Sequence, residues 1–501
     1  MDPSRGSTPE TPFATDVAPE KANAILSQFD RKRRAAGLIV PTDDIQVRFR
    51  LRELKEPVTI FGEGKAERRD RLRHLLLKKQ DQNGDLDPDG DVHLSDASDD
   101  DDDGNDKDNK DEEEFYTEGT DELLNSRKDM ARYSLGRAQH RINFQKVEST
   151  IPLRTHVKHR TEIKQRLKGI DLFASQVAAD RPVSITRFAP NGEIVAAGNW
   201  GGTIKLLDVP NLEEKKVYRG HNDRVGGISW FPGSTLPDQG VSPDSVNLAS
   251  GGGEGNVQLW SLNSETPLST LSGHSNRVCR VEFHPSGKYL ASASYDTTWR
   301  LWDVNTSTEI LLQEGHSREV YTVSFNGDGS LLASGGLDSL GRIWDLRTGR
   351  TIMLLEGHVK DIYGLDWSPD GYRVLTGSGD GLAICWDVRM VRELARIPAN
   401  SRGVTDLKWF KGTDGPASMK MPARDDQGEV VPKKSGTFFV SCGFDKNVTV
   451  FSANDWAPCR TLSGHSANVL STDVTNDGRW IVSSGHDRTV KLWARDDMEG
   501  I

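Results

Sequence analysis

The sequence has few of the features that mark secreted, membrane-spanning or metal-binding proteins. Its 501 residues include four cysteines, Cys279, Cys385, Cys442 and Cys459, and no two of them form a CxxC pair. We therefore expect neither disulfides nor a zinc site, but a reducing compartment. No window approaches the roughly 18 consecutive apolar residues of a membrane span. The N-terminal MDPSRGSTPETPF has no charged stretch followed by an apolar one, which predicts a soluble, intracellular protein without a signal peptide.

Motifs of common enzymes are also missing. No HRD-type catalytic loop and no DFG occurs, which argues against a protein kinase. The segment GEGKAERR at 62–69 places a Gly-rich turn before a helix but lacks the GxxxxGK(S/T) spacing, so nucleotide binding is not expected. Because no RNP-type aromatic pattern appears, any RNA contact should be to the backbone and strongly salt-dependent. We expect no enzymatic activity, no cofactor and no metal.

Charge is sorted along the chain behind a formal net charge of −11. Residues 31–79 carry 15 basic and 7 acidic side chains, residues 81–122 carry 2 and 20, and residues 127–168 carry 12 and 3. Two basic segments therefore flank an acidic one. Such blocks are typical of tails and interaction segments rather than of packed cores.

A repeat with a 42-residue spacing is the strongest signal in the sequence. One position, at the end of each xxLW-like stretch, recurs as Leu207, Trp260, Trp302, Trp344, Trp386, Phe451 and Trp493. Within each unit, short runs of alternating apolar and polar residues are separated by Pro-Asx-Gly or Ser-Gly turns, which predicts short antiparallel strands. Seven such units predict an all-β fold, a seven-bladed β-propeller over residues 169–501.

The repeats resemble the WD40 family over about residues 170–494. Gly-His pairs recur with the same period, at 220–221, 273–274, 315–316, 357–358 and 464–465. In that family the histidine, a Ser or Thr, an Asp and the tryptophan form a hydrogen-bonded chain in each blade, which gives partners to a buried indole and imidazole. The resemblance assigns this structural role to His274, Ser292, Asp296, Trp302, His316, Ser334, Asp338, Trp344, His358, Thr376, Asp380, Trp386, His465, Ser483, Asp487 and Trp493.

A His–Ser–Asp set is also what a hydrolase uses. Here the set occurs four times at fixed spacing, and active sites do not repeat in this way. The structural role is therefore favoured.

Three blades depart from the pattern. The second has Glu254 where Asp is expected, and the sixth lacks a Gly-His pair and has Phe451 in place of Trp. The first has Ala197, Gly201 and Leu207 at the corresponding positions. We expect these blades to be held more by apolar packing and to be locally less stable.

The last repeat ends in VKLWARDDMEGI without a following outer strand. An open propeller would leave a row of unpaired backbone groups. We expect IDLFASQVA, residues 170–178, to pair beside the strand that carries Trp493 and to close the ring. Two insertions, GSTLPDQGVSPDS and KGTDGPASMKMPARDDQGEVVPKKSG, predict surface loops, for which disorder is favoured over a binding role.

Four segments precede the propeller. Residues 1–37 are polar and should be disordered. Residues 38–80 predict two helices, one starting after Thr42 and stopped by Pro57 and one with leucines on a single side. Residues 81–120 form a disordered acidic linker, for which a plain spacer is favoured over a mimic of nucleic-acid charge.

Residues 121–168 predict a basic helical arm. Two interpretations stay open for it: packing on the propeller, or contact with phosphate. The candidates for contact with an RNA backbone are Arg154, Lys158, Arg160, Lys164, Arg166 and Lys168.

The segment with VPTDD, LRELKEPVTIFGEG and ERRDRLR resembles the splicing factor motif of pre-mRNA processing factors. This motif followed by a WD propeller resembles the pre-mRNA processing factor 4 family, the WD-repeat proteins of the U4/U6 small nuclear ribonucleoprotein. The resemblance implies a nuclear, non-catalytic scaffold of the tri-snRNP, with pre-mRNA processing factor 3 as direct partner and a cyclophilin as a further partner in some members. U4/U6 RNA would be reached indirectly or through its backbone. The alternative is a WD-repeat adaptor of another nuclear complex, such as a ubiquitin ligase or a chromatin complex.

Partners of WD propellers favour one rim of the central channel. Residues that precede the Asp position, or that start the inner strands, should lie at that rim. Aromatic and arginine side chains are frequent interface anchors. The candidates are Trp200, Arg224, Arg277, Arg280, Tyr295, Arg402, Phe444 and His486.

Overall fold

The computed structural model describes residues 40–41, 44–54, 56–58, 64–82, 120–424 and 428–495. The chain divides into two compact units, residues 1–114 and 115–501. The disorder expected for residues 1–37, and most of the expected acidic linker, lie outside the described residues. Among the helices that are described, none is long and apolar enough to cross a membrane.

The first unit contains two helices, α2 (Asp44–Glu53) and α3 (Lys65–Gln82). A buried apolar cluster joins them, formed by Val40, Val47, Leu51 and Leu72. Arg68 of α3 forms an ion pair with Asp44 at the start of α2. Both helices begin within residues 38–80, where a helical pair was expected, and α3 continues to Gln82; the expected cap, Thr42, is outside the described residues.

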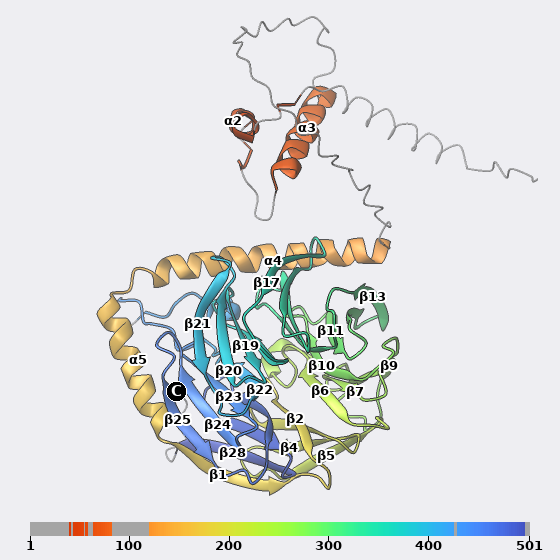
Figure 1. Ribbon diagram of the computed structural model, residues 1–501, viewed down its shortest axis with the longest axis vertical. Helices are drawn as coiled ribbons and strands as arrows, with labels where there is room; N and C mark the ends of the chain where they lie inside the picture. The colour runs from red at the N-terminus through yellow and green to blue at the C-terminus, as the bar shows by residue number, and fades with distance from the viewer. Residues whose placement is uncertain are drawn as a thin grey trace, which may run out of the picture. The chain divides into compact units, whose positions relative to one another are not determined.

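The second unit is a seven-bladed propeller, which confirms the predicted fold (Figure 1). Blade one comprises β2 (Val183–Phe188), β3 (Ile194–Asn199), β4 (Thr203–Asp208) and β5 (Glu214–Arg219). Blade two comprises β6 (Val225–Trp230), β7 (Leu248–Gly252), β8 (Val257–Trp260) and β9 (Ser269–Leu271). Blade three comprises β10 (Val278–Phe283), β11 (Tyr289–Ser294), β12 (Trp299–Asp303) and β13 (Thr308–Gln313).

The remaining blades follow in chain order. Blade four comprises β14 (Val320–Phe325), β15 (Leu331–Gly336), β16 (Gly341–Asp345) and β17 (Arg350–Leu355). Blade five comprises β18 (Ile362–Trp367), β19 (Arg373–Ser378), β20 (Leu382–Asp387) and β21 (Arg392–Pro398). Blade six comprises β22 (Val404–Trp409), β23 (Phe438–Gly443), β24 (Asn447–Ser452) and β25 (Pro458–Ser463). Blade seven comprises β26 (Val469–Val474), β27 (Ile481–Gly485), β28 (Thr489–Arg495) and β1 (Ile170–Val177).

Neighbouring blades are held together by apolar side chains. The middle strands are buried on both faces because each sheet packs between two others, and all six residues of β11 are buried. Trp299 of blade three contacts Trp344 of blade four, with ring centroids 5.8 Å apart. This packing explains why the residues of the middle strands are almost all apolar or small.

The ring closes through antiparallel pairing of β1 with β28. Leu172 lies opposite Trp493, and the register runs from Ile170 opposite Arg495 to Val177 opposite Thr489. The predicted closure is therefore confirmed. The first strand in the propeller completes the last blade, and the edge of β28 gains its missing partner.

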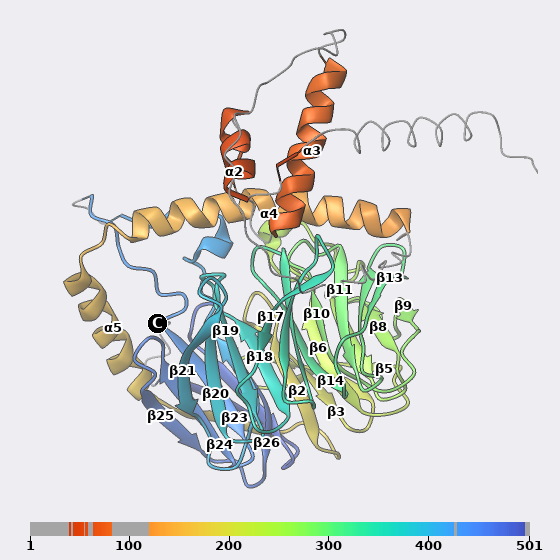
Figure 2. The ribbon, with the colours of Figure 1, turned by 45° about the horizontal axis from the view of Figure 1, so that its top comes forward.

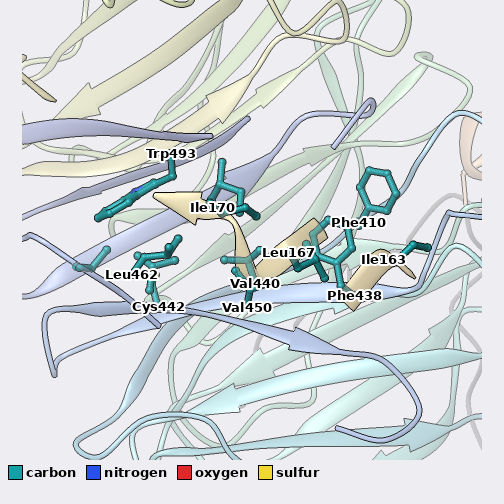
Figure 3. Packing of buried hydrophobic residues seen from close by; sticks show 13 residues of the cluster. Ile163, Leu167, Ile170, Phe410, Phe438, Val440, Cys442, Val450, Leu462 and Trp493 are labelled. Atoms are coloured by element: carbon teal, nitrogen blue, oxygen red, sulfur yellow. The ribbon is translucent and has the colours of Figure 1, made fainter. Parts of the chain in front are cut away.

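Two helices of the basic arm pack on the propeller: α4 (Asp121–Glu148) and α5 (Leu153–Lys168). Figures 1 and 2 show α4 along one side of the propeller and α5 beside β25. Met130 of α4 is buried in the core between blades three and four. Ile163 and Leu167 of α5 join a cluster that also contains Trp493 (Figure 3). Packing on the propeller, one of the two open interpretations, is thus observed.

The insertion loops contain short 3-10 helices, η1 (Pro237–Gln239) and η2 (Pro416–Ser418). The described part of the second loop is anchored: an Arg137 guanidinium N–H donates to the carbonyl of Ala417 at 3.5 Å, and Lys433 pairs with Glu148 at 3.0 Å. The expectation of a disordered loop is wrong there, because the loop binds α4, which the sequence alone did not place.

Removal of β1 tests the closure. We expect a chain that begins at residue 181 to lose the single cooperative melting transition, because β28 would lose the partner strand that now completes its sheet. A chain that begins at residue 169 keeps β1 and serves as the control. Differential scanning calorimetry of both chains measures the effect, and equal, cooperative melting of the two would contradict a closing role for β1.

Candidate functional site

Four blades contain a complete hydrogen-bonded chain of the four expected side chains. In blade three, His274 Nδ1 lies 2.7 Å from the Asp296 carboxylate and Nε2 lies 2.7 Å from the Ser292 hydroxyl. The Trp302 indole N–H donates to the same hydroxyl at 2.8 Å. The same contacts connect the other three sets, His316, Ser334, Asp338 and Trp344; His358, Thr376, Asp380 and Trp386; His465, Ser483, Asp487 and Trp493.

These chains have the geometry of a structural device. The hydroxyl of Ser292 is fully buried between the imidazole and the indole, so it is not available to attack a substrate. Each chain links the loop before an inner strand to the two middle strands of the same blade. The same geometry recurs in four blades, as expected for side chains that hold the strands of each blade together.

Blade two corrects one expectation. His221 Nδ1 lies 2.5 Å from Glu254, His221 Nε2 lies 2.7 Å from the Ser250 hydroxyl, and the Trp260 indole N–H donates to that hydroxyl at 2.8 Å. The longer side chain of Glu254 therefore completes the chain, and the expectation that this departure leaves blade two to apolar packing was wrong.

Blades one and six differ from the others in separate ways. In blade six, Asn400 occupies the place of the histidine, four residues before the inner strand, and its amide N–H donates to Asp445 at 2.5 Å. In blade one, Ala179, Ala197 and Leu207 lie in one apolar cluster, so packing replaces the polar chain as expected.

A cavity of about 260 Å³ lies at one mouth of the central channel. Each of the seven inner strands has a break in pairing register at its second residue, as in a β-bulge. The residues at this position all line the cavity: Ser184, Gly226, Cys279, Tyr321, Tyr363, Thr405 and Leu470. A bulge redirects the side chain of the extra residue, so the seven irregularities together shape this mouth.

Seven of the eight candidate rim residues also line this cavity: Trp200, Arg224, Arg277, Arg280, Tyr295, Phe444 and His486. The eighth, Arg402, is exposed and is not among the lining residues. Its backbone N–H donates to the Asn400 side chain at 2.9 Å. The structure thus brings seven of the eight together.

Arginine and aromatic side chains stack around the mouth. The Arg277 guanidinium lies 3.4 Å from the ring centroid of Tyr295, within the range of a cation–π contact. Tyr321 and Tyr363 are in edge contact, with centroids 5.2 Å apart, and Phe444 continues this row at 6.2 Å from Tyr363. The surface is thus aromatic with cationic groups, a composition that favours protein recognition.

Sequence reasoning missed Tyr321 and Tyr363. Both lie five residues after a Gly-His histidine, at His316 and His358. The signal was present as a fixed offset within the repeat. This offset did not identify Tyr321 and Tyr363 as rim residues, because the register break that turns their side chains to the mouth is visible only in the structure.

A buried charge network adjoins the mouth. Arg187 pairs with Asp406 at 3.0 Å, and the Ser471 hydroxyl donates to the same carboxylate at 2.9 Å. Burial alone would raise the pKa of Asp406, but Arg187 and Arg280 outweigh burial and lower it. Because these groups come from blades one, three, six and seven, the network fixes the blades relative to one another.

No group of three or more metal-ligating side chains occurs in the described parts of the chain. Burial raises the pKa of Cys279 to about 11, so this thiol is a poor nucleophile near neutral pH.

The candidate RNA-contacting residues of α5 fall into two groups. Arg154, Lys158, Arg166 and Lys168 are exposed. Lys164 forms an ion pair with Asp455 of blade six, and Arg160 is half-buried in a second cavity. The arm therefore exposes four of the six cations, while Lys164 and Arg160 contact the propeller or line the cavity beside it.

Known proteins resemble the chain in both parts. The family described as WD domain, G-beta repeat matches residues 212–261, 265–303, 307–345, 349–387 and 456–494. The family described as pre-mRNA processing factor 4 (PRP4) like matches residues 47–75.

Three relatives show the extent of the similarity. An uncharacterized WD repeat-containing protein of Schizosaccharomyces pombe is 37% identical over 57% of this chain and 59% of its own length. The U4/U6 small nuclear ribonucleoprotein Prp4 of Mus musculus is 39% identical over 46% of this chain and 42% of its own length. In these two comparisons, the chain covers less than two thirds of the relative. The U4/U6 small nuclear ribonucleoprotein PRP4 of Saccharomyces cerevisiae is 37% identical over 95% of both chains.

The blade chains should make stability depend on pH. Burial alone would raise the pKa of Asp296, but the hydrogen bonds from His274 and Thr298 outweigh it and hold the pKa below its ordinary value. Such a carboxylate contributes stability above its unfolded-state pKa of about 3.9, and this contribution is lost as pH falls. We expect Asp296→Asn to cost about 1–3 kcal/mol at neutral pH and to weaken the fall in stability on acidification.

Thermal melts between about pH 7 and pH 3 measure both effects. The control is Asp180→Asn, at an exposed position, which should leave the pH dependence unchanged. A pH profile of Asp296→Asn identical to that of the unaltered protein would show that this carboxylate contributes nothing to acid sensitivity.

Proposed function

Because this chain belongs to the pre-mRNA processing factor 4 family of U4/U6 small nuclear ribonucleoproteins, we propose that it is a nuclear scaffold of the U4/U6 particle and of the U4/U6-U5 tri-snRNP in pre-mRNA splicing. The observation that carries this proposal is the similarity to the Saccharomyces cerevisiae protein over 95% of both chains, which includes the N-terminal motif and the propeller. WD repeats alone occur in proteins of many functions. Their combination with the motif at 47–75 is specific.

The proposed mechanism is binding without catalysis. The rigid ring offers the channel mouth as one binding face, and the helices outside it offer others. Pre-mRNA processing factor 3 is the proposed direct partner, and a cyclophilin is a further one. U4/U6 RNA is bound indirectly or by its backbone, through the exposed cations of α5, Arg154, Lys158, Arg166 and Lys168.

The channel mouth is the proposed partner-binding surface of the propeller. Its aromatic row and the stacked Arg277 supply anchor groups of the kind that dominate protein interfaces. Tyr295 and Phe444 are half-buried rather than fully buried, so each keeps surface that a partner could cover. The fold presents these groups from different blades, which are fixed by the buried network beside them.

Purification of the tagged full-length chain from nuclear extract tests the proposal. We expect U4 and U6 RNAs to be enriched over U1 and U2 RNAs, because the chain would be part of the intact particle. Sequencing of the co-purified RNAs at moderate and high salt measures this. Recovery of the chain in another complex, without U4 and U6 RNAs, would favour the alternative of an adaptor elsewhere in the nucleus.

A variant of the mouth tests the surface itself. Replacement of Arg277, Tyr295 and Phe444 by Ala should weaken the capture of protein partners without lowering the melting temperature. The control carries Leu312→Ala and Met390→Ala, at two exposed apolar residues outside the mouth. Quantitative mass spectrometry of the captured proteins compares the two, and equal capture would exclude the mouth as the partner site.

A further inference from the structure

A second cavity, of about 300 Å³, lies between the helical arm and blades five and six. Residues from α4 and α5 form one wall, and residues beside β19 and β24, with the anchored loop before β23, form the other. It shares no lining residue with the channel mouth. It therefore offers a separate surface to which the proposed function assigns no role.

The lining of this cavity has an excess of positive charge. Four cations, Arg160, Arg373, Arg389 and Lys433, line it together with two carboxylates, Glu148 and Asp370. Both carboxylates are already engaged: Asp370 pairs with Arg373 and Lys433, and Glu148 pairs with Lys433 at 3.0 Å. Of the other two cations, Arg389 pairs at 3.5 Å with Asp387, which does not line the cavity, and Arg160 has no ion pair among the described residues.

Arg160 is the cation that lacks a partner. Within the described residues its side chain makes no hydrogen bond and no ion pair, although it is half-buried. Burial and the neighbouring Arg373 guanidinium lower the pKa of Arg160, and the attraction of Asp370 and Glu148 does not offset them. A guanidinium held against another cation at partial burial is unfavourable unless an anion joins them.

Two further donors in the cavity wall have no acceptor. Arg373 Nε and the Ser435 hydroxyl are buried and have no hydrogen-bond partner among the described residues. Arg389 is fixed at the wall by stacking on Tyr372, with its guanidinium 3.4 Å from the ring centroid. Buried donors are normally satisfied, so this set is suited to receive the acceptor oxygens of a ligand.

We propose that this cavity binds the phosphate monoester of a phosphorylated serine or threonine on a partner protein. Such a group carries a charge of about −1.5 to −2 near neutral pH and three acceptor oxygens, which match the excess of cations in the lining and the unpartnered donors. Arginine clusters recognise phosphorylated motifs in this way. An RNA phosphodiester carries one charge and follows an extended backbone, so it fits the exposed cations of α5 better than this cavity.

The test uses the full-length chain and the peptide acetyl-Gly-phosphoserine-Gly-amide, observed by ³¹P NMR. We expect saturable binding to the unaltered chain and no binding of the unphosphorylated peptide, observed by ¹H NMR. Arg160→Gln should weaken the affinity about tenfold or more, because it removes a charged donor. Its melting temperature should not fall, since Arg160 has no partner to lose.

The matched control is Arg132→Gln, an exposed arginine of α4 outside the cavity, which should bind the phosphopeptide as the unaltered chain does. Equal weakening by both substitutions, or no saturable binding to the unaltered chain, would overturn the proposal. A single-stranded RNA 12-mer is the third probe. If Arg160→Gln abolished RNA binding and left phosphopeptide binding intact, the cavity would be assigned to nucleic acid instead. None of these outcomes depends on whether U4 and U6 RNAs co-purify with the chain.

Discussion

The pairing of β1 with β28 is the interaction on which the rest of the propeller depends. The two strands are at opposite ends of the propeller sequence, and their backbone hydrogen bonds join the first and last repeats into one ring. Each inner strand reaches the channel mouth only because its neighbours on both sides hold it there. The charge network around Asp406 draws on blades one, three, six and seven, and it requires the closed ring in the same way.

Much of this fold could be predicted from the sequence because the repeat itself encodes it. The 42-residue spacing predicted the blades, and the last strand without a following partner predicted the closure of the ring. Comparison with the expected residue types did not predict the polar chains that use other residues. Glu254 reaches His221 as Asp would, and Asn400 takes the place of a histidine. In these two blades a different residue type supplies a hydrogen-bonding group at the same place.

The sites depended more on structure. Seven rim residues were predicted because they hold equivalent positions in the repeat, whereas Tyr321 and Tyr363 required knowledge of the bulge. The second cavity could not be predicted at all. Arg160 and Arg373 are separated by more than two hundred residues, and only the docking of α5 against blades five and six brings them to one wall. No periodicity relates a helix outside the repeats to the strands that it covers.

The helix α5 ends at Lys168 and the closing strand begins at Ile170, with Gly169 alone between them. Leu167 and Ile170 are buried in the same cluster as Trp493 (Figure 3). A force applied to α5 is therefore transmitted to the pairing of β1 with β28, because no loop lies between α5 and β1. If a partner holds α4 and α5 while its assembly is rearranged, the strain falls on the β1–β28 pairing that closes the propeller. Binding through these helices and the stability of the ring are therefore physically linked.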